Sequence, residues 1–79
     1  MQVEVRVRLK EHVLDPQGEA IRRVLAGLGY GEVSEVRVGK LMLVEVGGND
    51  PRQVRARVEA ACREVLSNPV IEDFEVRLP

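Results

Sequence analysis

The sequence predicts an α+β fold of the ferredoxin-like class (βαββαβ), in which a four-stranded antiparallel sheet carries two helices on one face. The first observation is the order of the hydrophobic patterns, which runs strand, helix, strand, strand, helix, strand. The second is a repeat, because an Asp-Pro pair precedes each helical pattern, at Asp15 and again at Asp50. The third is size: 79 residues with no linker fit one domain, residues 1–79.

The first half of the chain is predicted to form a strand, a helix and a second strand. Valine and leucine alternate with charged residues over 3–10, which is typical of a strand with one buried face. Asp15 can cap the helix that follows, Pro16 suits its first position, and Gly29 is a natural stop. The same alternation over 36–38 predicts the second strand.

The second half repeats this order. Gly39-Lys40 is predicted to be the two-residue loop of a hairpin, with Gly at the position that a type II′ turn requires. A third strand follows over 41–46. The second helix then begins after Asp50 and ends at Asn68-Pro69, because the residue before proline is disfavoured in the α region. The last strand is expected over about 70–78.

The third strand is apolar on both faces, which is unusual for this fold. If its even-numbered residues face the helices, Leu41 and Leu43 face outward from a central strand of the sheet. Exposed leucines at such positions favour a contact with another chain. Scattered surface hydrophobicity is the alternative interpretation.

Composition and charge narrow the classes of function. The net charge is −1, from 12 Lys and Arg against 13 Asp and Glu, so strong capture of nucleic acid is not indicated. One Cys and one His cannot build an internal disulfide or a metal cluster. No stretch approaches the roughly 18 apolar residues of a membrane span, and the N-terminus lacks the apolar core of a signal peptide. We therefore expect a cytoplasmic protein with no membrane partner.

No catalytic group is assembled in the sequence. Cys62 lies on the apolar stripe of the second helix and is expected to be buried, and His12 is expected on a surface loop. Glu72 falls on the otherwise apolar face of the last strand, where either a structural salt bridge or a functional role is open. Gly18 near a helix start costs stability, unless it permits close approach of another backbone.

Three segments, taken together, resemble one known family. They are Lys10 to Gly18 with Leu25 and Leu28-Gly29, then 36–40, then Cys62 with 66–74. In that order and spacing they resemble the PurS family, the small subunit of phosphoribosylformylglycinamidine synthase in de novo purine biosynthesis. The resemblance implies a ligase complex that uses glutamine and ATP, with a large synthetase subunit and a glutaminase subunit. It also implies that the small subunit joins the other two and supports ammonia transfer between them.

For this chain the resemblance implies no catalytic residue and no bound cofactor or metal, although the complex uses ATP and Mg. The implied partners are a second copy, in a homodimer or a tetramer, and the two larger subunits. The candidate contact residues are Asp15, Gln17, Gly18, Lys40, Leu41, Leu43, Asn68 and Glu72. Asp15, Lys40 and Asn68 have simpler roles as cap, turn and helix stop. The alternative function is an ACT-like regulatory module that binds a small amino acid or nucleotide at a dimer interface.

Overall fold

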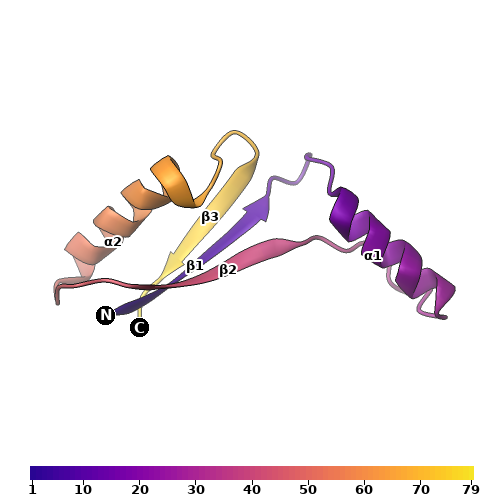
Figure 1. Ribbon diagram of the computed structural model, residues 1–79, viewed down its shortest axis with the longest axis horizontal. Coiled ribbons are helices and arrows are strands. Elements are labelled where there is room, and N and C mark those ends of the chain that lie inside the picture. Colours follow the sequence, from indigo (N-terminus) through magenta and orange to yellow (C-terminus); the bar gives the residue numbers. More distant parts are fainter.

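The structure is a computed structural model that describes residues 1–79. Its elements, in chain order, are β1 (Gln2–Leu9), α1 (Pro16–Gly27), β2 (Gly39–Glu45), α2 (Pro51–Ala61), the π-helical turn η1 (Cys62–Leu66) and β3 (Glu72–Arg77). The strands form one antiparallel sheet in the order β2-β1-β3 (Figure 1).

The core lies between the central strand β1 and the helix α2. Alternate residues of β1 point to one face, and Val3, Val5 and Val7 are all buried there. Val54, Val58 and Cys62 of α2 and η1 pack against them, and Val76 of β3 completes the cluster. Helical spacing puts the apolar residues of α2 on one side, so this single helix covers the sheet.

The first helix, α1, does not pack on the sheet. Figure 1 shows it extending away from the end of β1, on the opposite side from α2. Its apolar side chains are accordingly uncovered, with Val24 62% and Leu28 70% exposed. The chain measures 49 × 25 × 14 Å and has a radius of gyration of 16.0 Å, against about 12 Å for a compact domain of this length. None of its helices is long and apolar enough to cross a membrane.

The prediction of a four-stranded sheet with two helices on one face is therefore wrong. The sheet has three strands, and only α2 covers it. The expected strand over 36–38 is not in the sheet: this segment runs from α1 into β2 without a strand partner (Figure 1). As a result β2 is an edge strand, whereas its sequence had been expected in a central one.

The predicted hairpin is also wrong, and the first residues of β2 show why. Gly39 and Lys40 lie within β2, opposite Arg8 and Val7 of β1. A two-residue turn would have placed residue 38 opposite residue 41, and opposite residues share a face of the sheet. Val38 would then have faced outward with Leu41.

A straight chain keeps the apolar residues in phase. Val36 and Val38 fall on the same alternation as Met42 and Val44, and all four are half-buried. Their odd-numbered neighbours are exposed. The hydrophobic pattern thus favours one long extended segment through Gly39 over a turn at that point.

The predicted starts of both helices and the stop of the first at Gly29 are confirmed, whereas α2 ends at Ala61 and continues as η1, which ends at Leu66 shortly before Asn68. The Asp15 side chain accepts a hydrogen bond from the Gly18 amide at 2.8 Å, and Asp50 accepts one from the Arg52 amide at 3.0 Å. Gly29, just past α1, has a φ of 99°, a left-handed conformation that favours glycine. The last strand is shorter than expected, because residues 70 and 71 form a turn before β3.

Candidate functional site

One carboxylate fastens the start of α1 to the segment that enters β2. Oδ1 of Asp15 accepts from the Gly18 amide at 2.8 Å, and Oδ2 accepts from the Val38 amide at 2.7 Å. The two amide donors stabilise the charged carboxylate, so the Val38 amide first and the Gly18 amide next hold the pKa of Asp15 below its ordinary value. Asp15 is therefore more than a helix cap, because it also bonds a residue 23 positions away.

Gly18 permits the same two segments to touch. It is buried, and a Cβ at this position would lie 1.9 Å from the carbonyl oxygen of Val36. The backbone that Gly18 was expected to approach closely therefore belongs to the same chain. Nearby, Nη2 of Arg37 donates to the Lys10 carbonyl at 2.9 Å. We call residues 13–38 the α1 arm, since these contacts hold its helix and its return segment together.

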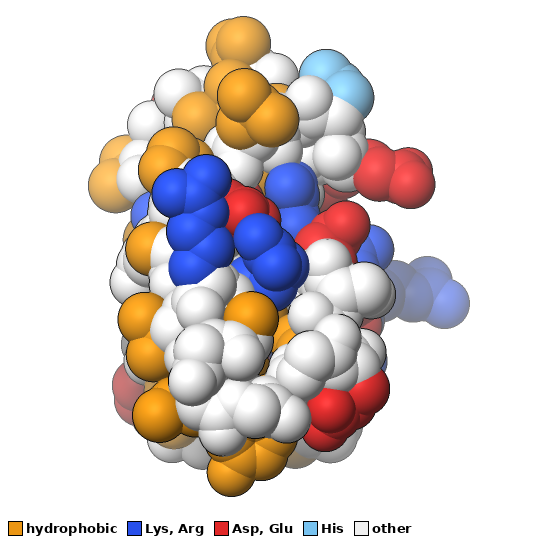
Figure 2. Space-filling view, turned by 90° about the vertical axis from the view of Figure 1, so that its right-hand side faces the viewer, with side chains coloured by type: hydrophobic (Ala, Val, Ile, Leu, Met, Phe, Trp, Pro, Cys, Tyr) orange, Lys and Arg blue, Asp and Glu red, His pale blue; other side chains and the backbone are white.

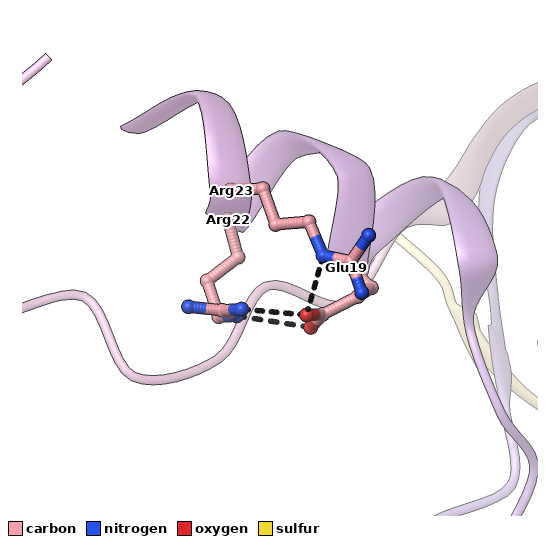
Figure 3. Close-up of polar contacts among 3 residues, drawn as sticks. All are labelled: Glu19, Arg22 and Arg23. Carbon is pink, nitrogen blue, oxygen red and sulfur yellow. Dashed lines mark hydrogen bonds and ion pairs between the residues drawn. The ribbon is translucent and has the colours of Figure 1, made fainter. Parts of the chain in front are cut away.

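The α1 arm has one charged and one apolar side. Glu19 accepts from Nε and Nη2 of Arg22 at 2.9 and 2.6 Å and from Nε of Arg23 at 3.3 Å (Figure 3). The Arg22 hydrogen bonds are the main cause that lowers the pKa of Glu19 to about 2. Figure 2, which looks at this end of the molecule, shows hydrophobic side chains along one side and charged ones across the middle.

The open face of the sheet carries the two predicted leucines. Leu41 and Leu43 lie on β2 opposite Arg6 and Glu4, and they are 59% and 62% exposed. Their outward direction agrees with the alternation in the sequence, and their role as contacts with another chain stays a prediction. Because β2 is an edge strand, they flank a row of backbone groups that lacks a strand partner.

A second group of candidates meets where the chain turns into β3. Oε1 of Glu72 accepts from the Asn68 amide at 2.7 Å, and its Oε2 lies 3.7 Å from Nζ of Lys40. The side chain of Glu72 is only 13% exposed. Its ion pair with Lys40 is the structural salt bridge that one of the two interpretations of Glu72 expected. The Asn68 side chain accepts from the Val70 amide at 3.1 Å. Lys40 was expected in a turn, which is wrong, because it pairs within β2.

Two further residues considered in the sequence, Gln17 and Cys62, take no part in these contacts. Gln17 is exposed on the first turn of α1. Cys62 is buried, as predicted, and burial raises the pKa of its thiol. Sequence reasoning missed the free edge of the segment that precedes β2, although the apolar residues in phase at 36, 38, 42 and 44 were a usable signal.

Comparison with known proteins places this chain. The family model PurS, described as phosphoribosylformylglycinamidine (FGAM) synthase, matches residues 2–79. The chain belongs to the PurS family. The PurS subunit of Bacillus subtilis is 44% identical over 72 residues, which cover 91% of this chain and 84% of that protein. The PurS subunit of Methanocaldococcus jannaschii is 38% identical over 72 residues, which cover 91% and 87%.

Solved PurS structures share the fold of this chain. A crystal structure of B. subtilis PurS superposes with a TM-score of 0.87 at 42% identity, covering 96% of this chain and 94% of that one. A chain in the structure of PurLQS from Thermotoga maritima superposes with a TM-score of 0.87 at 37% identity, covering 96% and 93%. At this coverage the superpositions include the α1 arm, so these two chains share its extended placement.

Proposed function

We propose that this chain is the non-catalytic small subunit of phosphoribosylformylglycinamidine synthase in de novo purine biosynthesis. In this role it joins the large ATP-dependent synthetase subunit to the glutaminase subunit and supports ammonia transfer between them. The observation that carries the proposal is the PurS family match over residues 2–79. The similarity to a chain of the T. maritima PurLQS structure supports assembly with two other kinds of subunit.

The contacts of the ionisable side chains support a structural part for this chain. Asp15 and Glu72, the two carboxylates among the candidate residues, both fasten one segment of the chain to another. The Cys62 thiol is buried, and its raised pKa keeps it protonated, which is unfavourable for a nucleophile. The proposal assigns ATP and Mg to the large subunit, and the whole complex to the cytoplasm.

The exposed apolar surface supports a homodimer as the form that the small subunit takes. The α1 arm leaves an apolar helix side uncovered, and the outer edge of β2 carries two exposed leucines. Surfaces of this kind on a small soluble chain mark contacts with other proteins. A second copy offers the same two surfaces, so a symmetric pair can cover both.

Reconstitution tests the proposed function. The large synthetase and the glutaminase of the same organism are purified without this chain, and formation of the amidine product is measured with glutamine or with ammonium as the nitrogen source. We expect glutamine-dependent turnover to appear only when this chain is added. Turnover with ammonium, which bypasses the glutaminase, serves as the control for an active large subunit. Full glutamine-dependent turnover without this chain would contradict the proposal.

A further inference from the structure

The exposed side of α2 carries arginines whose charge the chain does not neutralise. Val54, Val58 and Cys62 turn one side of α2 and η1 toward the core, so the opposite side faces away from the sheet. We call the four exposed arginines of these two elements the α2 arginines, and they are Arg52, Arg55, Arg57 and Arg63. None of them forms an ion pair with a carboxylate of the chain. They are therefore available to carboxylates from outside the chain.

Arginines on the other elements are mostly paired. Four of them lie 3.3 Å or less from a carboxylate two to four residues away, namely Arg6, Arg22, Arg23 and Arg77. Outside α2 and η1, only Arg8 and Arg37 lack such a partner. The second helix offers a suitable spacing, because Glu59 lies four residues after Arg55 and four before Arg63, yet neither pair forms. The α2 arginines thus stay unpaired even where a carboxylate is near in sequence.

Two of the α2 arginines are oriented by contacts that leave their charge uncompensated. Nη1 of Arg55 donates to the Val76 carbonyl at 3.0 Å, and the guanidinium of Arg63 lies over the Phe74 ring, 6.0 Å from its centroid. A neutral carbonyl and an aromatic ring fix the direction of a guanidinium but do not cancel its positive charge. The other two α2 arginines donate no side-chain hydrogen bond within the chain.

The charge of the chain is divided unevenly between this helix and the rest. Residues 51–66 have four arginines against Glu59 and Glu64, which gives a net charge of +2. The remaining residues have eight basic and eleven acidic side chains, which gives −3. A nearly neutral chain therefore has one basic face. Such a face attracts an acidic one, and the planar fork of an arginine matches a carboxylate.

The α2 arginines lie apart from the surfaces that the homodimer is proposed to use. The helix covers β1 and β3, whereas β2 forms the other edge of the sheet and the α1 arm extends away on the opposite side (Figure 1). Residues 51–66 also contain no aromatic side chain on which a base could stack, and the whole chain has a net charge of −1. An acidic protein surface therefore fits this face better than a nucleic acid does.

We propose that the α2 arginines dock a carboxylate-rich surface of the glutaminase subunit. The docking surface rests on the proposed function, which supplies this partner. On the side of the helix between Arg52 and Arg63 the exposed residues are Ala56 and Ala60, so the contact buries little apolar area and depends on charge. A contact of this kind is sensitive to salt and dissociates readily. It suits the glutaminase, which turnover with ammonium bypasses, better than the synthetase, which every turnover requires.

Charge reversal at Arg52 and Arg57 tests the docking surface with little effect on the fold. Both side chains are exposed and unbonded, and glutamate is favourable in a helix interior and in the first turn of a helix. The test variant is Arg52→Glu/Arg57→Glu, and Arg52→Gln/Arg57→Gln removes the charge without reversing it. Arg8→Glu is the control, because Arg8 is exposed and unpaired on β1.

The measured quantity is the glutaminase concentration that gives half-maximal glutamine-dependent turnover in a fixed mixture of the synthetase and this chain. We expect this concentration to rise at least about tenfold with Arg52→Glu/Arg57→Glu and about threefold with Arg52→Gln/Arg57→Gln. Arg8→Glu should stay within about twofold of the wild type. Added salt should raise the wild-type concentration, and the charge-reversed variant should lose most of that dependence.

The wild-type chain separates the two possible failures. Equal half-maximal concentrations for the wild type and both α2 variants would overturn the docking surface alone, whereas no glutamine-dependent turnover with the wild type would overturn the proposed function. Loss of binding to the synthetase by itself in Arg52→Glu/Arg57→Glu would overturn the choice of the glutaminase. Binding of the wild type to a mixed-sequence RNA, abolished by the same substitutions, would assign the face to nucleic acid and overturn the docking surface as well.

Discussion

At Gly18 the main chain of α1 lies against the main chain of the segment that enters β2, with no room for a side chain. A Cβ there would be 1.9 Å from the Val36 carbonyl oxygen, which must then move. Gly27, in the same helix, has nothing within 4 Å of the corresponding position. The two glycines therefore form a matched pair, in which only one is required for packing.

Replacement of these glycines should have opposite effects on stability. We expect Gly18→Ala to lower the free energy of unfolding by about 1–3 kcal/mol through the steric clash. Gly27→Ala should raise it by up to about 1 kcal/mol, because alanine favours the helix. Urea denaturation followed by circular dichroism measures both. Equal stability of the two variants would show that α1 does not rest on Val36.

Glu72, which bonds two segments of the chain together, and Gln17, which is exposed, should respond differently to replacement by alanine. Glu72→Ala removes the acceptor of the Asn68 amide and the partner of Lys40, so we expect a loss of about 1–2 kcal/mol of stability. Gln17→Ala should leave the melting temperature unchanged, since Gln17 is exposed, and weaken assembly with the larger subunits. Thermal unfolding and co-purification measure the two effects. If Gln17→Ala assembles normally, Gln17 is not a contact.

The Glu19–Arg22 pair makes a pH-dependent contribution to α1. The folded-state pKa of Glu19, about 2, lies below its ordinary value of 4.5, because Arg22 hydrogen bonds to the carboxylate. The contribution is therefore complete above about pH 4.5 and is lost as the pH falls toward 2. NMR titration of the Glu19 carboxyl should show this low pKa, and Arg22→Ala should move it toward 4.5. An unchanged pKa in Arg22→Ala would contradict the assignment to Arg22, and Arg23→Ala provides the control.

Among the elements, α2 alone covers the sheet, so the core depends on its buried face. Val58 is 4% exposed and touches the valines of β1, whereas Val65, one helical turn beyond α2, is 78% exposed. Val58→Ala is expected to cost about 2 kcal/mol of stability through the lost contacts and the cavity. Val65→Ala should change it by less than about 0.5 kcal/mol. Calorimetric unfolding of both variants tests this, and an equal loss would place the core elsewhere.

The same scale shows what could be predicted from the sequence. Alternation over β1 and the Asp-Pro starts of α1 and α2 are local signals, and the structure confirms them. The hairpin at Gly39 failed because a turn signal of two residues was weighed above the phase of Val36, Val38, Met42 and Val44. The apolar stripe of α1 was also visible, but a stripe does not state which surface covers it. Of the candidate site, a salt bridge of Glu72 was one of two open interpretations, and a close backbone approach at Gly18 was expected. Lys40 as the partner of Glu72 and the Asp15–Val38 bond were not foreseen.

As a whole molecule, the chain has the dimensions of an open subunit. Its radius of gyration of 16.0 Å and its uncovered α1 arm follow from one cause, the straight passage of the chain through Gly39. A closed hairpin would have folded the arm back onto its own sheet. The open form leaves the covering of both the arm and the β2 edge to association, which agrees with the assembly role proposed for this member of the PurS family.

Hydrogen exchange at β2 tests this central claim most directly. The amides of Met42 and Val44 bond to β1 within one chain, whereas those of Leu41 and Leu43 point to the outer edge and are protected only if a second copy pairs there. We predict protection of all four amides at high protein concentration, with Leu41 and Leu43 losing theirs on dilution while Met42 and Val44 keep it. Exchange of Leu41 and Leu43 at the rate of an unprotected peptide at every concentration, with Met42 and Val44 still protected, would contradict the account.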